Sequence, residues 1–114
     1  MNTKLQDLKT TIETIDVIPQ EEELFGGANL IISDDKDRYK KDHDVLVVSE
    51  YAKEISWFVY QLKKIFSNDL DYMNKYAFYP HIGILLNEAI SEGKNLREQM
   101  IYALENLGEF RRTE

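Results

Sequence analysis

The sequence predicts a mainly helical fold: a small antiparallel bundle of four to five helices, formed by one domain over residues 1–114. Apolar residues recur at every third or fourth position over most of the chain, which is the helical period. Capping residues, prolines and glycines separate these stretches by short connections, and short connections favour antiparallel neighbours. A hydrophobic content of 43% in 114 residues suffices for one core.

The first expected helix lies near the N-terminus. Its buried face consists of apolar residues three or four positions apart: Leu5, Leu8, Ile12 and Ile15. Thr3 and Gln6 have the spacing of a capping box, and Pro19 should end the helix. Residues 19–29 combine a proline, three consecutive acids and a glycine pair, so we expect one short helical turn followed by a flexible break.

Residues 30–48 allow two interpretations. Short β-branched runs at 30–32 and 45–48 flank a charged stretch, and the two runs could pair as a minor β-hairpin with a long polar loop. The second run also continues the helical phase of the segment that follows it. We favour a helix for residues 45–48 and keep the hairpin as the alternative.

The segment Ser49–Phe66 has the clearest helical pattern. Its apolar stripe begins one residue before the segment and steps by three and four: Val48, Tyr51, Ile55, Phe58, Leu62 and Ile65. Ala52, Val59 and Phe66 widen this stripe. The polar residues 67–69 resemble the cap of a further helix, which should stop or kink near Tyr79 because a proline follows.

Two more helices are expected after Pro80. The first carries an apolar stripe and should end at Gly93: Ile82, Leu85, Leu86, Ala89 and Ile90. Asn95 and Glu98 have the spacing of an N-cap and capping box for the second. That last helix has its own stripe: Leu96, Met100, Ala103, Leu107 and Phe110.

The composition restricts the classes of function. The net charge is −7, with 11 acids against 6 bases in residues 1–44, and such a charge disfavours general nucleic-acid binding. The absence of cysteine excludes disulfides and thiolate sites. There is neither a signal-peptide pattern nor a membrane-length apolar run, so we expect a cytoplasmic protein without membrane contact. Ten lysines against four arginines suggest an AT-rich bacterial or mobile-element gene.

No pattern for catalysis or metal binding is evident. The stretch 34–37 resembles the start of a calcium loop, but Lys40 and Leu46 occupy the places that require glycine and a bidentate glutamate. His43 and His81 lack a metal-binding partner at helical spacing. No hydroxyl is marked as a nucleophile by a neighbouring base. We therefore expect a protein that is not an enzyme and has no cofactor and no metal.

Two features point to a binding surface. On the helix at 49–66, two aromatic and two basic side chains lie opposite the main stripe, as in an interface anchor: Trp57, Tyr60, Lys53 and Lys64. An acidic surface with one aromatic residue forms the second feature: Asp34, Asp35, Asp37, Tyr39, Asp42 and Asp44. The simpler interpretations are a central helix covered on both sides and a solvated charged face.

The leading functional hypothesis is a small acidic protein that binds and regulates or inhibits another protein, one with a basic surface. Immunity proteins, antitoxins and phage inhibitors provide fold-level analogies only. One alternative is a nucleic-acid mimic that fills a basic groove. Another is a helix-turn-helix DNA binder with its turn at 91–95 and phosphate contacts from Arg97, Arg111 and Arg112. The wide apolar stripes also permit a homodimer.

Overall fold

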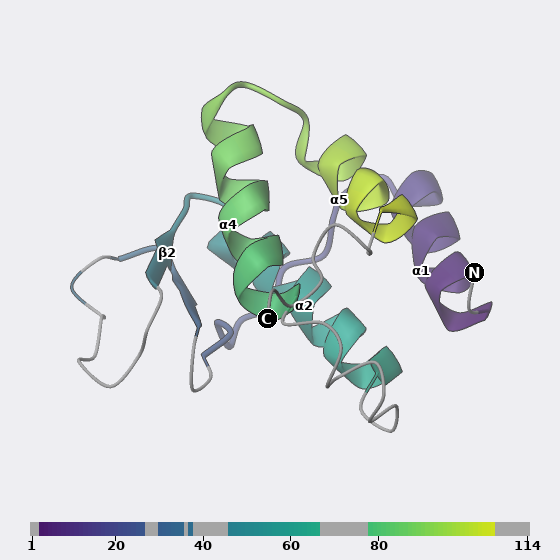
Figure 1. Cartoon of the computed structure of the whole chain (residues 1–114), viewed down its shortest axis with the longest axis horizontal. Coiled ribbons are helices and arrows are strands. Elements are labelled where there is room, and N and C mark those ends of the chain that lie inside the picture. Colours follow the sequence, from purple (N-terminus) through teal and green to yellow (C-terminus); the bar gives the residue numbers. More distant parts are fainter. Residues whose placement is uncertain (1–2, 27–29, 36, 38–45, 67–77, 107–114) are drawn as a thin grey trace, which may run out of the picture.

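A computed structural model describes residues 3–26, 30–35, 37, 46–66 and 78–106 of the chain. In chain order the elements are α1 (Thr3–Thr14), β1 (Ile31–Ser33), β2 (Leu46–Val48), α2 (Ala52–Phe66), α4 (Phe78–Ser91) and α5 (Leu96–Glu105) (Figure 1). The expected mainly helical fold is confirmed, and a two-stranded parallel sheet accompanies the helices. The antiparallel order of the helices stays a prediction.

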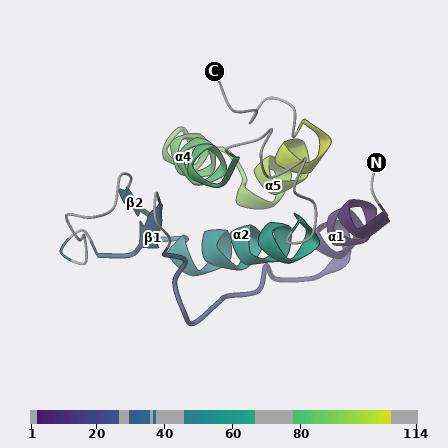
Figure 2. The same ribbon diagram turned by 60° about the horizontal axis from the view of Figure 1, so that its bottom comes forward.

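Helix α2 is the centre of the arrangement. Helices α4 and α5 lie on one side of it, and the connection from α1 to the sheet runs along another side (Figure 2). The sheet packs near one end of α2, where β1 contacts α2 and β2 contacts α4. Helix α1 packs against α5 and α2. The core between these elements includes fully buried side chains from five of them: Ile12, Ile32, Ile55, Phe58, Leu62, Ile82 and Met100.

Helix α1 has the expected buried face, formed by Leu5, Leu8 and Ile12. The helix ends at Thr14, well before the proline that was expected to end it. The hydroxyl of Thr14 donates to the carbonyl of Thr10 at 2.8 Å. The Arg97 side chain of α5 binds carbonyls in the last turn of this helix and just beyond it, so a tertiary contact rather than a local proline accompanies its termination.

The helical turn expected within residues 19–29 is wrong for residues 19–26, which contain no helix. This segment runs along α2, with the Glu21 N–H donating to the Lys53 carbonyl at 3.1 Å. Phe25 is buried, and its N–H donates to the Ser56 hydroxyl at 2.9 Å. The backbone of this segment therefore finds partners on a neighbouring element, which replace those that a helical turn would supply.

The region 30–48 forms neither of the two expected structures. β1 and β2 pair in parallel, with Ile32 opposite Val47, so both the hairpin and a helix over 46–48 are wrong; Val45 lies outside the described residues. Ile32 and Val47 are both buried, which aligns the two apolar runs on the core face. Twelve residues separate the strands, which is enough for the crossover that parallel pairing requires. On its other edge, β1 forms an antiparallel bridge between Ile31 and Gly26.

Helix α2 begins at Ala52, three residues later than its apolar pattern suggests. Ser49 accepts a hydrogen bond from the N–H of Tyr51 through its hydroxyl at 3.0 Å, and its carbonyl accepts one from Ala52. Val48 and Tyr51, which the stripe assigned to the core, are 42% and 36% exposed. Both positions precede the first residue of α2, so the helical period does not determine where their side chains point.

The turn between α4 and α5 has the expected stop at Gly93 and the expected N-cap at Asn95. Gly93 has φ of 85°, its N–H donates to Ile90, and the N–H of Lys94 donates to Ala89, which is a Schellman motif. Asn95 caps α5 by accepting from the N–H of Glu98 at 3.1 Å.

The start of α4 differs from the expectation. Helix α4 begins at Phe78, two residues before the expected start at Pro80, and contains this proline in its first turn. The expected cap at 67–69 and the helix before residue 78 lie outside the described residues, as do Leu107 and Phe110.

Candidate functional site

The aromatic residues predicted to anchor a partner are half-buried on α2. Trp57 and Tyr60 both pack against the core. The ring of Tyr60 meets that of Phe25 edge-on, with centroids 5.2 Å apart and planes at 64°. The Lys63 ammonium lies 5.7 Å from the centroid of the Phe25 ring. The segment before β1 thus occupies part of the face that the sequence analysis assigned to a partner.

The charges around these aromatic residues are partly paired within the chain. The Lys53 ammonium lies 3.2 Å from the Glu22 carboxylate, and Lys64 is exposed. Burial, together with the negative charges of Glu23 and Glu21, raises the pKa of the Tyr60 hydroxyl above its ordinary value. The carboxylates thus disfavour a charged tyrosine at this position.

The predicted acidic surface is only partly described. Asp34, Asp35 and Asp37 are exposed, whereas Tyr39, Asp42 and Asp44 lie outside the described residues. The Ser33 hydroxyl accepts from the N–H of Asp35 and donates to its carbonyl, at 3.0 and 2.9 Å. The Asp35 carboxylate accepts from the N–H of Asp37 at 2.8 Å. Local turn bonds therefore account for the conformation of this stretch.

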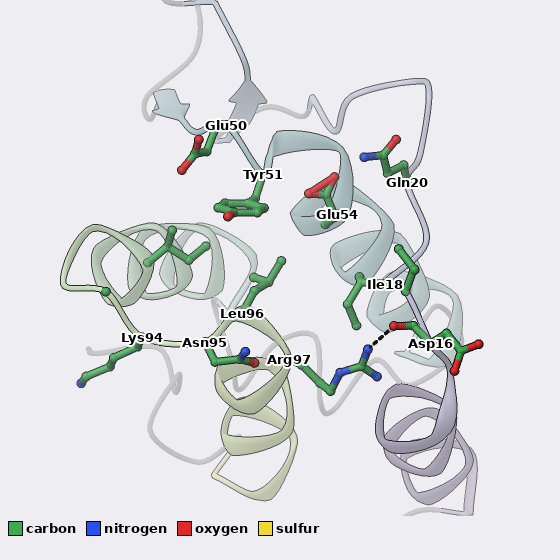
Figure 3. A pocket seen from close by; sticks show the side chains of 13 residues that line it. Asp16, Ile18, Gln20, Glu50, Tyr51, Glu54, Lys94, Asn95, Leu96 and Arg97 are labelled. Atoms are coloured by element: carbon green, nitrogen blue, oxygen red, sulfur yellow. Dashed lines mark hydrogen bonds between the residues drawn. The ribbon is translucent and has the colours of Figure 1, made fainter.

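A different site is formed by parts of the chain that are distant in sequence. A pocket of about 630 Å³ lies between residues 16–20, the beginning of α2 and the turn from α4 to α5 (Figure 3). Its polar lining includes three carboxylates and two cationic side chains: Asp16, Glu50, Glu54, Lys94 and Arg97. Its volume falls within the range of about 300–1,000 Å³ that is typical of ligand sites.

Both cations of this pocket have partners in the chain. The Arg97 guanidinium donates to the carbonyl of Ile12, to that of Ile15 at 2.6 Å and to that of Asp16 at 2.9 Å (Figure 3). These carbonyls lie in and just beyond the last turn of α1, where backbone acceptors are unpaired and the helix dipole favours a cation. The Lys94 ammonium lies 3.6 Å from the Glu92 carboxylate. Arg97 is thus engaged within the chain, and Lys94 forms a long ion pair between two exposed side chains.

The carboxylates of the pocket, unlike its cations, have no partner among the described residues. Within the described residues, those of Asp16, Glu50 and Glu54 accept no hydrogen bond and form no ion pair. Asp16 and Glu50 are exposed at the rim. Glu54 is only 8% exposed and belongs to the first turn of α2, where the helix dipole favours a negative charge. A buried acceptor without a partner is uncommon and therefore informative.

Apolar side chains complete the pocket. Val17 is 76% exposed and Tyr51 is 36% exposed, and both belong to the lining. Ile18 is buried, while Ile90 and Leu96 are half-buried against the core. The pocket therefore combines an apolar wall with unpaired negative charge.

This site could not be predicted from the sequence, because its residues carry almost no local signal. Glu54 looks like an ordinary acid in the first turn of a helix, and Arg97 was assigned to phosphate contacts. Only tertiary packing brings Arg97 to the end of α1, 82 residues away from Ile15. The one local signal was Val17, an apolar residue outside the stripe of the first helix.

The chain was compared with protein-family models, with curated proteins and with solved structures, and none of the three comparisons finds a match. None of the helices in the described part of the chain is long and apolar enough to cross a membrane. Among the same residues, no group of three or more histidine, cysteine or acidic side chains is placed to hold a metal ion.

Proposed function

We propose that this chain is a non-enzymatic protein that binds another protein and regulates or inhibits it, and that the partner presents a basic surface. The observation that carries the proposal is the pocket beside the start of α2, in which the cations are paired and the carboxylates are not. The unpaired carboxylates of this pocket can bind a positively charged group of a partner. The net charge of −7 would steer a basic partner towards the molecule.

Apolar surface at the same place supports a protein as the partner. Val17 and Tyr51 are exposed beside the carboxylates, and protein interfaces combine buried apolar contacts with a polar rim. A nucleic acid would bring phosphates to Asp16 and Glu50, which repel them.

The helix-turn-helix alternative loses support from the same contacts. Arg97, one of its three expected phosphate contacts, is engaged with α1, and Arg111 and Arg112 lie outside the described residues. The exposed side of α5 includes the acids Glu98 and Glu105. These charges would oppose a DNA backbone.

A nucleic-acid mimic is the second candidate. The exposure of Asp34, Asp35 and Asp37 on a hydrogen-bonded turn is the observation that favours it. Such a mimic would bind its basic groove with a steep salt dependence.

Affinity capture with matched baits tests the proposal and separates it from the mimic. One bait carries Asp16→Lys and Glu50→Lys at the rim of the pocket, and its control carries Asp34→Lys and Asp37→Lys. All four residues are exposed, and the two baits have the same charge. We expect a basic protein that the wild type and the control bait capture and the pocket bait loses. A partner lost only by the control bait would support the mimic, and partners shared by all three baits would contradict both.

A further inference from the structure

We infer that the pocket receives an arginine side chain of the partner protein, whose guanidinium pairs with the Glu54 carboxylate. This inference rests on the proposed function and specifies its chemistry. The Glu54 carboxylate is the most buried of the three carboxylates and, among the described residues, has no hydrogen-bond partner. A charge that is 8% exposed and unpaired would gain more from a cation than either of the exposed carboxylates at the rim.

The shape of the lining favours a long cationic side chain over a small cation. Ile18 and Leu96 provide apolar surface against which an aliphatic stem can pack. The carboxylates of Asp16 and Glu50 lie at the rim, where they would attract positive charge before it enters. Among the described residues no set of acids is placed to chelate a metal ion.

Arginine fits this lining better than lysine. A guanidinium binds a carboxylate through two parallel hydrogen bonds and is more weakly hydrated than an ammonium, so it costs less to bury. Tyr51 is a partly exposed aromatic residue of the same wall, and Figure 3 shows its ring and the Glu54 side chain at the same end of α2. A guanidinium can stack on an aromatic face while it pairs with a carboxylate.

The resident arginine of the pocket does not satisfy this carboxylate. The guanidinium of Arg97 is directed to the carbonyls of Ile15 and Asp16, on the side of the pocket formed by the end of α1 (Figure 3). Moving it to Glu54 would leave the α1 carbonyls without their donor. Arg97 is the only arginine among the described residues, so none of these residues offers a second guanidinium, and the one inferred here belongs to the partner.

The experiment titrates the isotope-labelled full chain with three capped pentapeptides and follows its amide NMR signals. The peptides are identical except for a central arginine, lysine or citrulline, and citrulline is the neutral analogue of arginine. We expect the arginine peptide to shift signals of residues 50–54 and 93–97 and to bind about tenfold or more tightly than the citrulline peptide, the minimum for a hydrogen bond to a charged group. Lysine should be intermediate.

Two substitutions give the matched test. Glu54→Gln removes the charge with little change in shape, and we expect it to weaken the arginine peptide about tenfold or more. Glu50→Gln removes an exposed rim charge and should weaken it only about two- to threefold. Thermal unfolding of both variants shows whether each is folded. Tyr51→Phe should keep the affinity and Tyr51→Ala should lower it, if the ring supplies a stacking surface.

Several outcomes would overturn the inference. Equal affinity for arginine and citrulline, an unchanged affinity of the Glu54→Gln variant, or no shifts at millimolar peptide would each do so. If the arginine peptide fails but the Asp16 and Glu50 bait still loses a basic partner, only the arginine pocket is wrong. If the peptide binds as expected but no captured protein depends on the pocket baits, the proposed function is wrong and the pocket chemistry remains.

Discussion

The guanidinium of Arg97 donates a hydrogen bond to the main-chain oxygen of Ile15 at 2.6 Å, and so joins the first turn of α5 to the end of α1. The same guanidinium also binds the carbonyls of Ile12 and Asp16. One side chain thus caps a helix more than 80 residues away and forms one wall of the pocket.

The Arg97 contact should contribute measurably to stability. Lysine keeps the charge but cannot reach three carbonyls with one rigid fork, so we expect Arg97→Lys to lower the free energy of unfolding by about 1–3 kcal/mol. Lys94→Met, at an exposed position with a long ion pair, should change it by less than about 0.5 kcal/mol. Urea unfolding measures both, and an Arg97→Lys variant as stable as the wild type would refute the cap.

Two glycines should respond to alanine in opposite directions. A Cβ at Gly83 would lie 3.5 Å from Leu30 and 3.5 Å from Val47, which is ordinary contact, and alanine favours the helix. We expect Gly83→Ala to raise the free energy of unfolding by up to about 1 kcal/mol. Gly93 has φ of 85°, so Gly93→Ala should lower it by about 1–2 kcal/mol. Thermal unfolding of the two variants side by side tests the pair; a loss of stability at Gly83 would show that the strands cannot accept the methyl group.

The cap of α5 predicts a graded series at one position. Asn95→Ala removes the oxygen that accepts from the N–H of Glu98, and we expect a loss of about 1 kcal/mol. Asn95→Asp keeps an oxygen acceptor at the same place and should stay close to the wild type. Denaturant unfolding of the three proteins would detect the order, and equal losses from both substitutions would contradict the cap.

Tyr60 should make stability fall at high pH. Its pKa is raised in the folded protein by burial and by Glu23 and Glu21, so the unfolded chain loses the phenolic proton first. Its contribution is therefore complete below the ordinary pKa of 10.0 and is lost as the pH rises through the folded pKa. We expect Tyr60→Phe to flatten this decline and to leave stability near pH 7 almost unchanged. Urea unfolding midpoints of the wild type and the variant, from neutral to alkaline pH, measure this decline in stability. The same decline in both proteins would show that the pKa of Tyr60 is not raised in the folded state.

The Glu54 carboxylate should not contribute to the stability of the free protein. If its buried carboxylate serves a partner, Glu54→Gln should leave the free energy of unfolding unchanged or raise it, because a partnerless buried charge costs free energy. The helix dipole contributes in the opposite direction by at most about 2 kcal/mol. Calorimetry on the variant checks this, and a loss of several kcal/mol would indicate a structural role for the carboxylate instead.

Elements with local signals were predictable from the amino-acid sequence alone. The apolar stripe identified α1 and most of α2, and Gly93 and Asn95 located the turn between α4 and α5 to the residue. Each of these features depends on neighbours three to five positions away, so a pattern in the chain is sufficient to detect it.

The other features depend on contacts between elements, which no local pattern reveals. Short apolar runs fit a strand or a helix equally well, and only the fold shows that Ile32 and Val47 pair in parallel strands with both side chains buried. Helix α1 ended at Thr14 rather than at Pro19, and a guanidinium from α5 binds carbonyls in its last turn and just beyond it. The pocket also depends on tertiary contacts. Its cationic side chains have partners within the chain and its carboxylates do not, and this difference results from contacts between residues remote in sequence.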